Sequence, residues 1–462
     1  MSERRFPDGF LWGTATSAYQ IEGDAAGRGH SIWDTFCRQP GRVAKRDNGD
    51  VACEHVARYR DDVKLLQQLG VSAYRLSIAW PRVKPYGEGE VNQAGLDFYD
   101  RLVDELLAAG IDPWVTLYHW DLPQALQDRG GWPARRTVDA FVGFADLMSR
   151  RLGDRVGHWI THNEPWCVAI LGYQTGLHAP GWRDPAAALA AAHHLLLSHG
   201  KAVPVIRANV PDATVGITLN MVPAVPASPS EADRLATERF DGHFNRWFLD
   251  PLAGRGYPSD IVAHYRDKGF LPAEGPLPFE QPGDQQAIAV ETDFLGINYY
   301  SRGIIRSDEV AEEDNAPRTL PEPAKDNCTD IGWEVWPDGL HDLLTRLRDD
   351  YPQPIYITEN GAAYQTGPDD DGAVPDTKRQ AYLAGHLDAC WRAVRDGVDL
   401  RGYFVWSLMD NFEWHDGYEQ RFGVVYVDFE TQQRIIKDSG HYYSRVARTN
   451  TLDPAPSPTK RT

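Results

Sequence analysis

Two glutamates, Glu164 and Glu359, have neighbours that are typical of a catalytic pocket. Asn163 precedes the first, Asn360 follows the second, and each glutamate ends a run that predicts a β-strand. A pair of carboxyl groups across a pocket is what hydrolysis of a glycosidic bond requires, because one protonates the leaving oxygen and the other attacks or stabilises the anomeric carbon. A lone glutamate is more often a surface or helix-capping residue, so this hypothesis depends on the two lying together.

Other polar and aromatic residues also lie in predicted strands or in the segments that follow them. They are Arg75, His119, Trp120, Asn220, Asn298, Tyr300, Trp406, Glu413 and Trp414. Histidine is the commonest metal ligand, but no H-E-x-x-H or similar spacing accompanies His119. Neither a Walker-type loop nor a G-x-S-x-G motif occurs. The sequence therefore predicts a site of carboxyls, amides and aromatic rings, with no metal and no cofactor.

The elements that must position these residues alternate between strand and helix. Eight short apolar runs predict strands at Phe10–Thr14, Ala73–Ile78, Trp114–Tyr118, His158–Thr161, Thr214–Leu219, Phe294–Tyr299, Ile355–Thr358 and Gly402–Trp406. Helical patterns span Tyr59–Leu69, Leu96–Ala109, Pro133–Leu152, Pro185–Asn209, Leu340–Asp350 and Lys378–Asp396. Alternation of this kind predicts a parallel sheet with crossover helices. An open sheet of the nucleotide-binding type would need a Gly-rich turn after the first strand, which is missing.

We therefore predict an α/β fold, a single (β/α)8 TIM barrel with elaborated loops at the C-terminal face of the strands. Active sites of such barrels lie at that face, and Glu164 and Glu359 would end the fourth and seventh strands, on opposite sides of the ring. Length alone favours about three domains, but single barrels with insertions reach this size. We expect the barrel over residues 1–447, a long loop at Asp308–Asn327, and a disordered tail over 448–462 that is rich in Pro, Ser and Thr.

Composition excludes several other classes of protein. The net charge is −19, which disfavours binding to nucleic acid or to anionic membrane surfaces. Five scattered cysteines without a C-x-x-C pair predict neither a disulfide framework nor a zinc site. The first residues lack a secretory signal, and no apolar run approaches the ~18 residues that cross a bilayer, so we expect a cytoplasmic protein. The 15 Trp, 20 Tyr and 16 Phe favour equally a well-packed core and a flat-faced sugar ligand.

Several motifs resemble the signatures of family 1 glycoside hydrolases, the β-glucosidase family. Asn163–Pro165 and Ile357–Gly361 resemble its acid/base and nucleophile motifs. Further resemblances cover Phe10–Gly23, Tyr74–Arg82 and Leu408–Trp414, and the similarity runs from about Phe6 to Tyr443. The resemblance implies that Glu164 is a general acid and then a general base, that Glu359 is the nucleophile, and that Arg75 and Tyr300 keep Glu359 ionised.

The same resemblance implies further roles for pocket residues. The implied sugar-binding residues are Gln20, His119, Trp120, Asn163, Asn298, Trp406, Glu413 and Trp414. Those of the aglycone entrance are Trp166, Leu171 and Trp333, for which core packing is the alternative interpretation. We expect Cys167, near the pocket wall, to be a packed thiol. We also expect the neighbouring Glu359 carboxylate to raise the pKa of Glu164.

The implied activity is that of a retaining exo-β-glycosidase, a β-glucosidase that releases β-D-glucose by double displacement. Its substrates would be oligosaccharides, such as those from cellulose, or aryl and alkyl β-glucosides, with side activity on β-galactosides and β-fucosides. The phospho-sugar branch of the family has Ser in place of Glu413, and Lys and Tyr where this chain has Gln420 and Phe422. A 6-phospho-β-glucosidase and an inactive sugar-binding barrel remain alternatives, and the sequence does not decide between monomer and homo-oligomer.

Overall fold

The computed structural model describes residues 4–308, 327–351 and 353–452. Nearly all of the predicted loop Asp308–Asn327, and the tail after residue 452, lie outside these ranges. The start of the predicted tail, residues 448–452, belongs to the folded part instead. The last helix runs to Thr449, and the Asn450 side chain accepts a hydrogen bond from Trp12 Nε1 at 2.9 Å and donates to the Phe6 carbonyl. These contacts with the amino-terminal segment order a stretch whose composition alone favours disorder.

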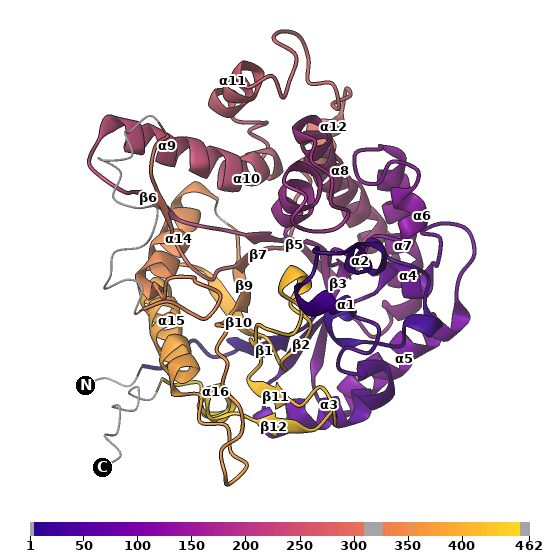
Figure 1. Cartoon of the computed structure of the whole chain (residues 1–462), viewed down its shortest axis with the longest axis vertical. Helices are drawn as coiled ribbons and strands as arrows, with labels where there is room; N and C mark the ends of the chain where they lie inside the picture. Colours follow the sequence, from indigo (N-terminus) through magenta and orange to yellow (C-terminus); the bar gives the residue numbers. More distant parts are fainter. Residues whose placement is uncertain (1–3, 309–326, 352, 453–462) are drawn as a thin grey trace.

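Eight parallel strands form a closed barrel (Figure 1). They are β1 (Leu11–Ala15), β2 (Ala73–Ser77), β3 (Asp112–Tyr118), β4 (His158–Asn163), β5 (Thr214–Asn220), β7 (Phe294–Asn298), β9 (Ile355–Asn360) and β10 (Leu400–Trp406). The order around the ring is β1-β10-β9-β7-β5-β4-β3-β2. Ala15 of β1 pairs with Trp406 on one side and with Arg75 on the other, which closes the barrel. The predicted fold class is therefore confirmed.

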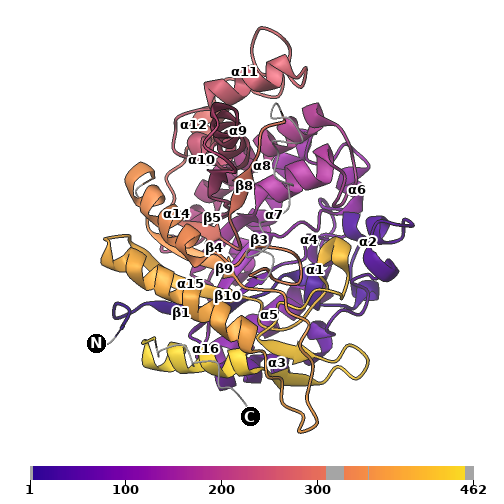
Figure 2. The ribbon, with the colours of Figure 1, turned by 60° about the vertical axis from the view of Figure 1, so that its left-hand side comes forward.

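Long helices surround the barrel, as the two ribbon views show (Figure 1, Figure 2). They are α3 (His55–Leu69), α5 (Gln93–Ala108), α7 (Arg136–Leu152), α8 (Pro185–Asn209), α14 (Pro337–Asp350), α15 (Thr377–Arg395) and α16 (Asp438–Thr449). The first six occur where periodicity predicts them. In α7, Phe141, Ala145, Met148 and Leu152 are buried, as expected when one face of an amphipathic helix packs on a sheet.

Shorter elements occupy the loops, and sequence periodicity predicts none of them. The short helices are α1 (Ala18–Ile21), α2 (Ile32–Cys37), α4 (Trp80–Val83), α6 (Gln124–Gln127), α9 (Glu231–Asp241), α10 (Trp247–Leu252), α11 (Ser259–Asp267) and α12 (Asp284–Ile288). Two small sheets pair β6 (Ala224–Pro226) with β8 (Gly303–Ile305), and β11 (Val425–Val427) with β12 (Arg434–Ile436). Elements this short carry too few residues for a periodic signal.

Aromatic side chains fill the amino-terminal part of the barrel interior. The Trp114 ring lies 4.7 Å from Tyr356 and 5.3 Å from both Phe294 and Phe404, measured between ring centroids. Because this apolar layer closes that end, the polar residues at the opposite strand ends face the open end. Among the described residues, no helix combines the length and apolar character that crossing a membrane would need.

Candidate active site

A cavity of about 680 Å³ opens at the carboxyl ends of the strands. Twelve of the fifteen residues predicted for the site line it: His119, Trp120, Glu164, Trp166, Leu171, Asn298, Tyr300, Trp333, Glu359, Trp406, Glu413 and Trp414. The other three, Gln20, Arg75 and Asn163, are fully buried and bond to residues of the cavity wall. The structure therefore brings the whole predicted set together.

Glu359, near the end of β9, is held by two donors. Arg75 Nη1 donates to its Oε1, and Tyr300 Oη donates to its Oε2 at 2.7 Å. Burial raises the pKa of Glu359, whereas the Arg75 charge and the Tyr300 hydrogen bond oppose that rise. Arg75 is itself fixed, because its second amino group donates to Asn163 Oδ1 at 2.6 Å. The pKa of Glu359 stays above its ordinary value because burial is the largest cause, but Arg75 and Tyr300 stabilise the carboxylate, the form a nucleophile requires.

Glu164, directly after β4, has weaker donors, and no cation among the described residues forms an ion pair with it. Asn298 Nδ2 donates to its Oε1 at 2.7 Å, and the Cys167 thiol lies 3.3 Å from its Oε2. Burial raises its pKa to about 8, with the Glu359 charge as the second cause. The expected rise is present, but burial, not the neighbouring carboxylate, is its larger source. At neutral pH, Glu164 holds a proton that it can donate.

Glu164 and Glu359 lie at the ends of the fourth and seventh barrel strands, as predicted, and β5 and β7 lie between these strands in the ring. Asn298, at the end of the intervening strand β7, connects their surroundings. Its amide donates to Asn163 and Glu164, while its Oδ1 accepts from Thr358 Oγ1 at 2.7 Å. The Asn298 side chain therefore connects the end of β4 to β9 and fixes the position of one strand end relative to the other.

Three residues of the cavity wall have left-handed backbone conformations. The φ angles are 78° at Trp120, 51° at Glu164 and 52° at Trp414. Such a conformation costs a non-glycine residue about 1–3 kcal/mol and is found where surrounding contacts hold it, often at functional sites. The Glu164 amide donates to the Thr218 carbonyl at 2.9 Å. This bond anchors the turn that directs the carboxyl into the cavity.

His119 lines the cavity as a neutral imidazole. Burial and the Arg75 charge lower its pKa, so the imidazole is neutral. Asn163 Nδ2 lies 3.2 Å from Nε2, and since an amide nitrogen can only donate, Nε2 is the acceptor. The proton then resides on Nδ1, which is buried and has no hydrogen-bond partner among the described residues.

Aromatic rings form one side of the inner cavity. Trp406 is nearly parallel to His119, with centroids 5.8 Å apart and an angle of 15°. Trp414 lies 4.6 Å from Trp120. Flat faces of this kind pack against the C–H face of a sugar ring, while the polar edges bind its hydroxyls.

Glu413 and Gln20 occupy the same part of the site. Gln20 Nε2 donates to the Phe412 carbonyl at 2.7 Å and lies 3.5 Å from Glu413 Oε2. Burial raises the pKa of Glu413, and Asp416 and Glu359 add to the rise. Among the described residues, no cation forms an ion pair with Glu413, so its acceptor oxygens remain available to a ligand.

The outer cavity is apolar on two sides. Trp166 packs on Phe244 with centroids 4.1 Å apart, and Trp333 packs on Tyr300 at 5.1 Å. Trp333 is 36% exposed, so its ring is accessible at the mouth. Leu171 also lines the cavity.

Sequence reasoning missed several residues of the outer wall. They include His178, Phe244, Arg302 and His415. Phe244 and His415 lie in short helical turns, and His178 and Arg302 lie in loops, where spacing carries no information. Asn220, which directly follows a predicted strand, also lines the cavity. Cys167 is not only a packed thiol, since it contacts the Glu164 carboxyl and also accepts from Asn220 Nδ2 at 3.4 Å.

Comparisons with known proteins agree with this geometry. The model of glycosyl hydrolase family 1 matches residues 2–452. Beta-glucosidase A of Thermotoga maritima is 46% identical over 98% of this chain and 100% of its own length. A bifunctional beta-D-glucosidase/beta-D-fucosidase of Bifidobacterium breve is 43% identical over 95% of this chain and 97% of its own.

Solved structures give the same result. The family 1 β-glucosidase of Thermotoga maritima superposes with a TM-score of 0.91 at 45% identity, covering 98% of this chain and 100% of that one. The AHE enzyme of Alicyclobacillus herbarius has a TM-score of 0.90 at 49% identity, covering 97% and 99% of the two chains.

Proposed function

Because the chain belongs to glycosyl hydrolase family 1, we propose that it is a retaining exo-β-glucosidase. It releases β-D-glucose from the non-reducing end of oligosaccharides or from aryl and alkyl β-glucosides, with lower activity on β-galactosides and β-fucosides. The observation that carries the proposal is the contrast between two neighbouring carboxyls. Glu359 is bonded by Arg75 and Tyr300, whereas Glu164 forms an ion pair with no cation among the described residues and has a pKa raised to about 8.

In the first step the Glu359 carboxylate attacks the anomeric carbon while Glu164 protonates the departing oxygen. A covalent glycosyl-enzyme forms, and the charge on Glu359 is lost in the ester. The pKa of Glu164 then falls, because the neighbouring charge that opposed its ionisation is gone. Glu164 next removes a proton from water, which attacks the anomeric carbon from the face that the aglycone left, and the bond from that carbon to Glu359 breaks to release the carboxylate. Two inversions give net retention.

The shape of the cavity supports exo action on one sugar ring. The inner part, with Trp406, His119 and Glu413, offers one aromatic face and several polar edges, and it is closed below by the barrel interior. The outer part, with Trp166 and Trp333, receives the aglycone. A pocket closed at its inner end favours attack on the terminal sugar, and we expect the non-reducing end to enter.

An unphosphorylated glycone agrees best with the charges of the wall. Glu413 repels a phosphate dianion when ionised. Arg302 lines the cavity but is paired with both oxygens of Glu334, at 2.7 and 3.1 Å. The described wall thus has no unpaired arginine or lysine for a 6-phosphate. Parallel assays with 4-nitrophenyl β-glucoside and its 6-phosphate distinguish the two activities, and turnover of either excludes an inactive sugar-binding protein.

Two variants, Glu164→Ala and Glu359→Ala, test the roles of the carboxyls. We expect Glu359→Ala to abolish turnover of both 4-nitrophenyl and 2,4-dinitrophenyl β-glucoside, because no intermediate forms. Glu164→Ala should retain attack on the dinitrophenyl substrate, whose leaving group needs little protonation. Azide should then accelerate its turnover and give β-glucosyl azide, since azide attacks the intermediate without a base.

Glu334→Gln is the matched control, because Glu334 is also buried in the wall but is paired with Arg302. Glu334→Gln should retain both the formation and the hydrolysis of the glycosyl-enzyme. Formation of β-glucosyl azide by the Glu359 variant, and not by the Glu164 variant, would reverse the two roles. An α-configured first product from the unaltered enzyme, detected by NMR, would exclude the retaining mechanism.

A further inference from the structure

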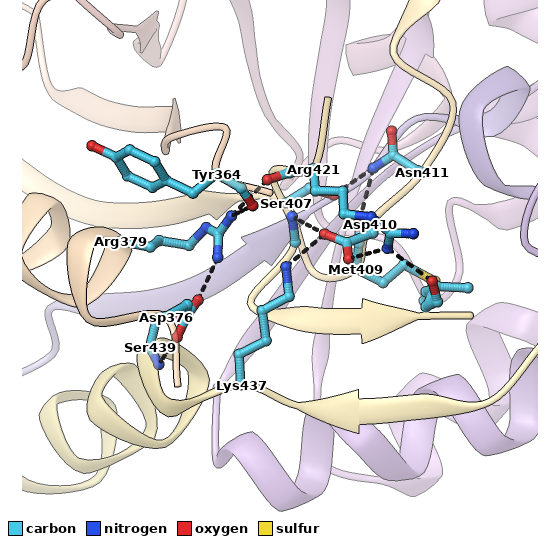
Figure 3. Close-up of polar contacts among 12 residues, drawn as sticks. Tyr364, Asp376, Arg379, Ser407, Met409, Asp410, Asn411, Arg421, Lys437 and Ser439 are labelled. Carbon is cyan, nitrogen blue, oxygen red and sulfur yellow. Dashed lines mark hydrogen bonds and ion pairs between the residues drawn. The ribbon is translucent and has the colours of Figure 1, made fainter. Parts of the chain in front are cut away.

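A buried cluster of charges lies behind the loop that carries Glu413 and Trp414 (Figure 3). Asp410 is its centre and is fully buried. Its Oδ1 accepts from Lys437 Nζ at 2.7 Å and from the Gly423 amide at 3.0 Å, and its Oδ2 accepts from Arg421 Nη1 at 2.8 Å. One carboxylate thus joins both arms of the β10 loop to Lys437, which follows β12.

A second buried ion pair extends the cluster toward the loop after β9. Arg379 donates to the Ala362 carbonyl at 3.0 Å and to the Arg421 carbonyl at 2.6 Å. It also pairs with Asp376, which accepts from the Ser439 amide at 2.7 Å. The loop that follows Glu359 is therefore held by α15 and by the first turn of α16, as Figure 3 shows.

The cluster is connected to the cavity through Asn411. The Asn411 amide donates to Ser407 Oγ at 3.0 Å and to the Met409 carbonyl at 2.9 Å, and its Oδ1 accepts from Gln20 Nε2 at 3.0 Å. Gln20 in turn reaches Glu413. From Asp410 to Glu413 the loop is therefore bonded at successive residues and has little freedom to shift.

Stability alone does not account for this arrangement. Ion pairs buried in a protein are often no more stabilising than well-packed apolar residues, because desolvation offsets the attraction. What they do supply is a defined geometry, since each charge requires particular partners. Burial would raise the pKa of Asp410, but Lys437 and Arg421 hold it below its usual value. The carboxylate is therefore ionised and fully bonded.

We propose that Asp410, fixed by Lys437 and Arg421, is a positioning residue that sets the place of Glu413 and Trp414 in the glycone site. Neither Asp410 nor Lys437 lines the cavity. Both act through the loop, so the segment from β12 to α16 contributes to sugar recognition without touching the sugar. This inference rests on the proposed function, because it assumes that Glu413 and Trp414 bind the glycone.

Asp410→Asn and Lys437→Met test the proposal. We expect kcat/KM for 4-nitrophenyl β-glucoside to fall about 10- to 100-fold, since displacement of a binding group by about 1 Å has effects of this size. The kcat/KM for 2,4-dinitrophenyl β-glucoside and the affinity for deoxynojirimycin should fall by the same factor. The reason is that the variants alter the glycone site and leave the leaving-group side unchanged. The pH limbs of kcat/KM should not move, which separates loop displacement from damage to Glu164 or Glu359.

Asp284→Asn is the matched control. Asp284 is equally buried and pairs with Arg135 and His193, but it lies on α12, outside the cavity. Asp284→Asn should lower the melting temperature about as much as Asp410→Asn does. Its kcat/KM should stay within about twofold of that of the unaltered enzyme. If Asp410→Asn does not fold, Lys437→Met and Arg421→Gln give the same comparison, since Arg421 is partly exposed.

A double-mutant cycle with Glu413→Gln tests whether Asp410 acts through Glu413. If Asp410 acts through Glu413, Asp410→Asn should change kcat/KM less than about threefold in the Glu413→Gln background. Additive effects in the cycle, or losses in Asp410→Asn no greater than in Asp284→Asn, would overturn the inference. Absence of β-glucoside turnover by the unaltered enzyme would instead contradict the proposed function, so the two failures are distinguishable.

Discussion

Glu164 and Glu359 are chemically identical, yet their environments push them toward different protonation states. Both are buried, which disfavours a charge on either. At Glu359, Arg75 and Tyr300 oppose the effect of burial, although the pKa remains raised. Among the described residues, Glu164 receives only an amide and a thiol. Different surroundings of this kind are how two carboxyls are assigned to the roles of acid and nucleophile.

At the scale of the residue, Glu164 determines the alkaline side of the pH profile. Its pKa is raised to about 8, so the proton needed for leaving-group departure is lost above that value. We expect kcat/KM for 4-nitrophenyl β-glucoside to fall as pH rises through about 8, and to fall in acid as Glu359 becomes protonated. In Glu164→Gln, measured with the dinitrophenyl substrate, the alkaline limb should disappear. Its persistence would assign the limb to another group.

At the scale of the element, the end of β10 and the loop after β9 approach so closely that only glycine is possible at position 361. A Cβ on Gly361 would lie 1.7 Å from the Trp406 carbonyl oxygen. The contact is with backbone, so no side chain can move aside to relieve it. This close approach sets the separation between Glu359 on β9 and the Trp406 ring.

We therefore expect Gly361→Ala to force the two segments apart. Overpacking of this kind costs about 1–3 kcal/mol, measurable as a lower free energy of unfolding in urea, and kcat should fall at least tenfold because Glu359 moves. Gly367→Ala, in the same loop but with no atom within 4 Å of the new Cβ, is the control and should behave as the unaltered enzyme. Equal behaviour of both variants would show that the backbone has room to move.

At the scale of the whole molecule, buried histidines make the fold sensitive to acid. Burial lowers the pKa of His194 and His386 to about 4 and that of His199 to about 3. Unfolding would restore each pKa to ~6.5. Between these values the unfolded chain binds more protons than the folded one, so stability is lost as pH falls below about 6.5.

As pH falls through that window, each of these histidines should lower the free energy of unfolding by about 1.4 kcal/mol per pH unit. We expect the urea midpoint to decrease between pH 7 and pH 5, and His386→Gln to reduce the slope, since Gln can keep the contact with the Tyr382 carbonyl without titrating. His441→Gln, on exposed surface, is the control. A slope that His386→Gln leaves unchanged would assign the acid sensitivity to carboxylates.

Local sequence predicted the parts of this protein that neighbouring residues encode. The pattern of α8 runs from Pro185 to Asn209 in the sequence and in the structure, because Asp184 caps the helix and apolar residues continue to its end. The barrel strands lie within about two residues of their predicted places. The motifs around Glu164 and Glu359 identify the site, because short segments carry the residue types that the chemistry needs.

Tertiary structure decided what depends on residues far apart in the chain. Asn298 donates a hydrogen bond to Glu164, 134 positions away in the sequence. Lys437, 27 positions after Asp410, donates to the Asp410 carboxylate. The order of the segment after Thr449, the role of burial in the pKa of Glu164 and the contact of Cys167 with its carboxyl arise from packing. Periodicity and spacing describe a single stretch of chain, whereas burial and electrostatic fields sum over every element that surrounds a group.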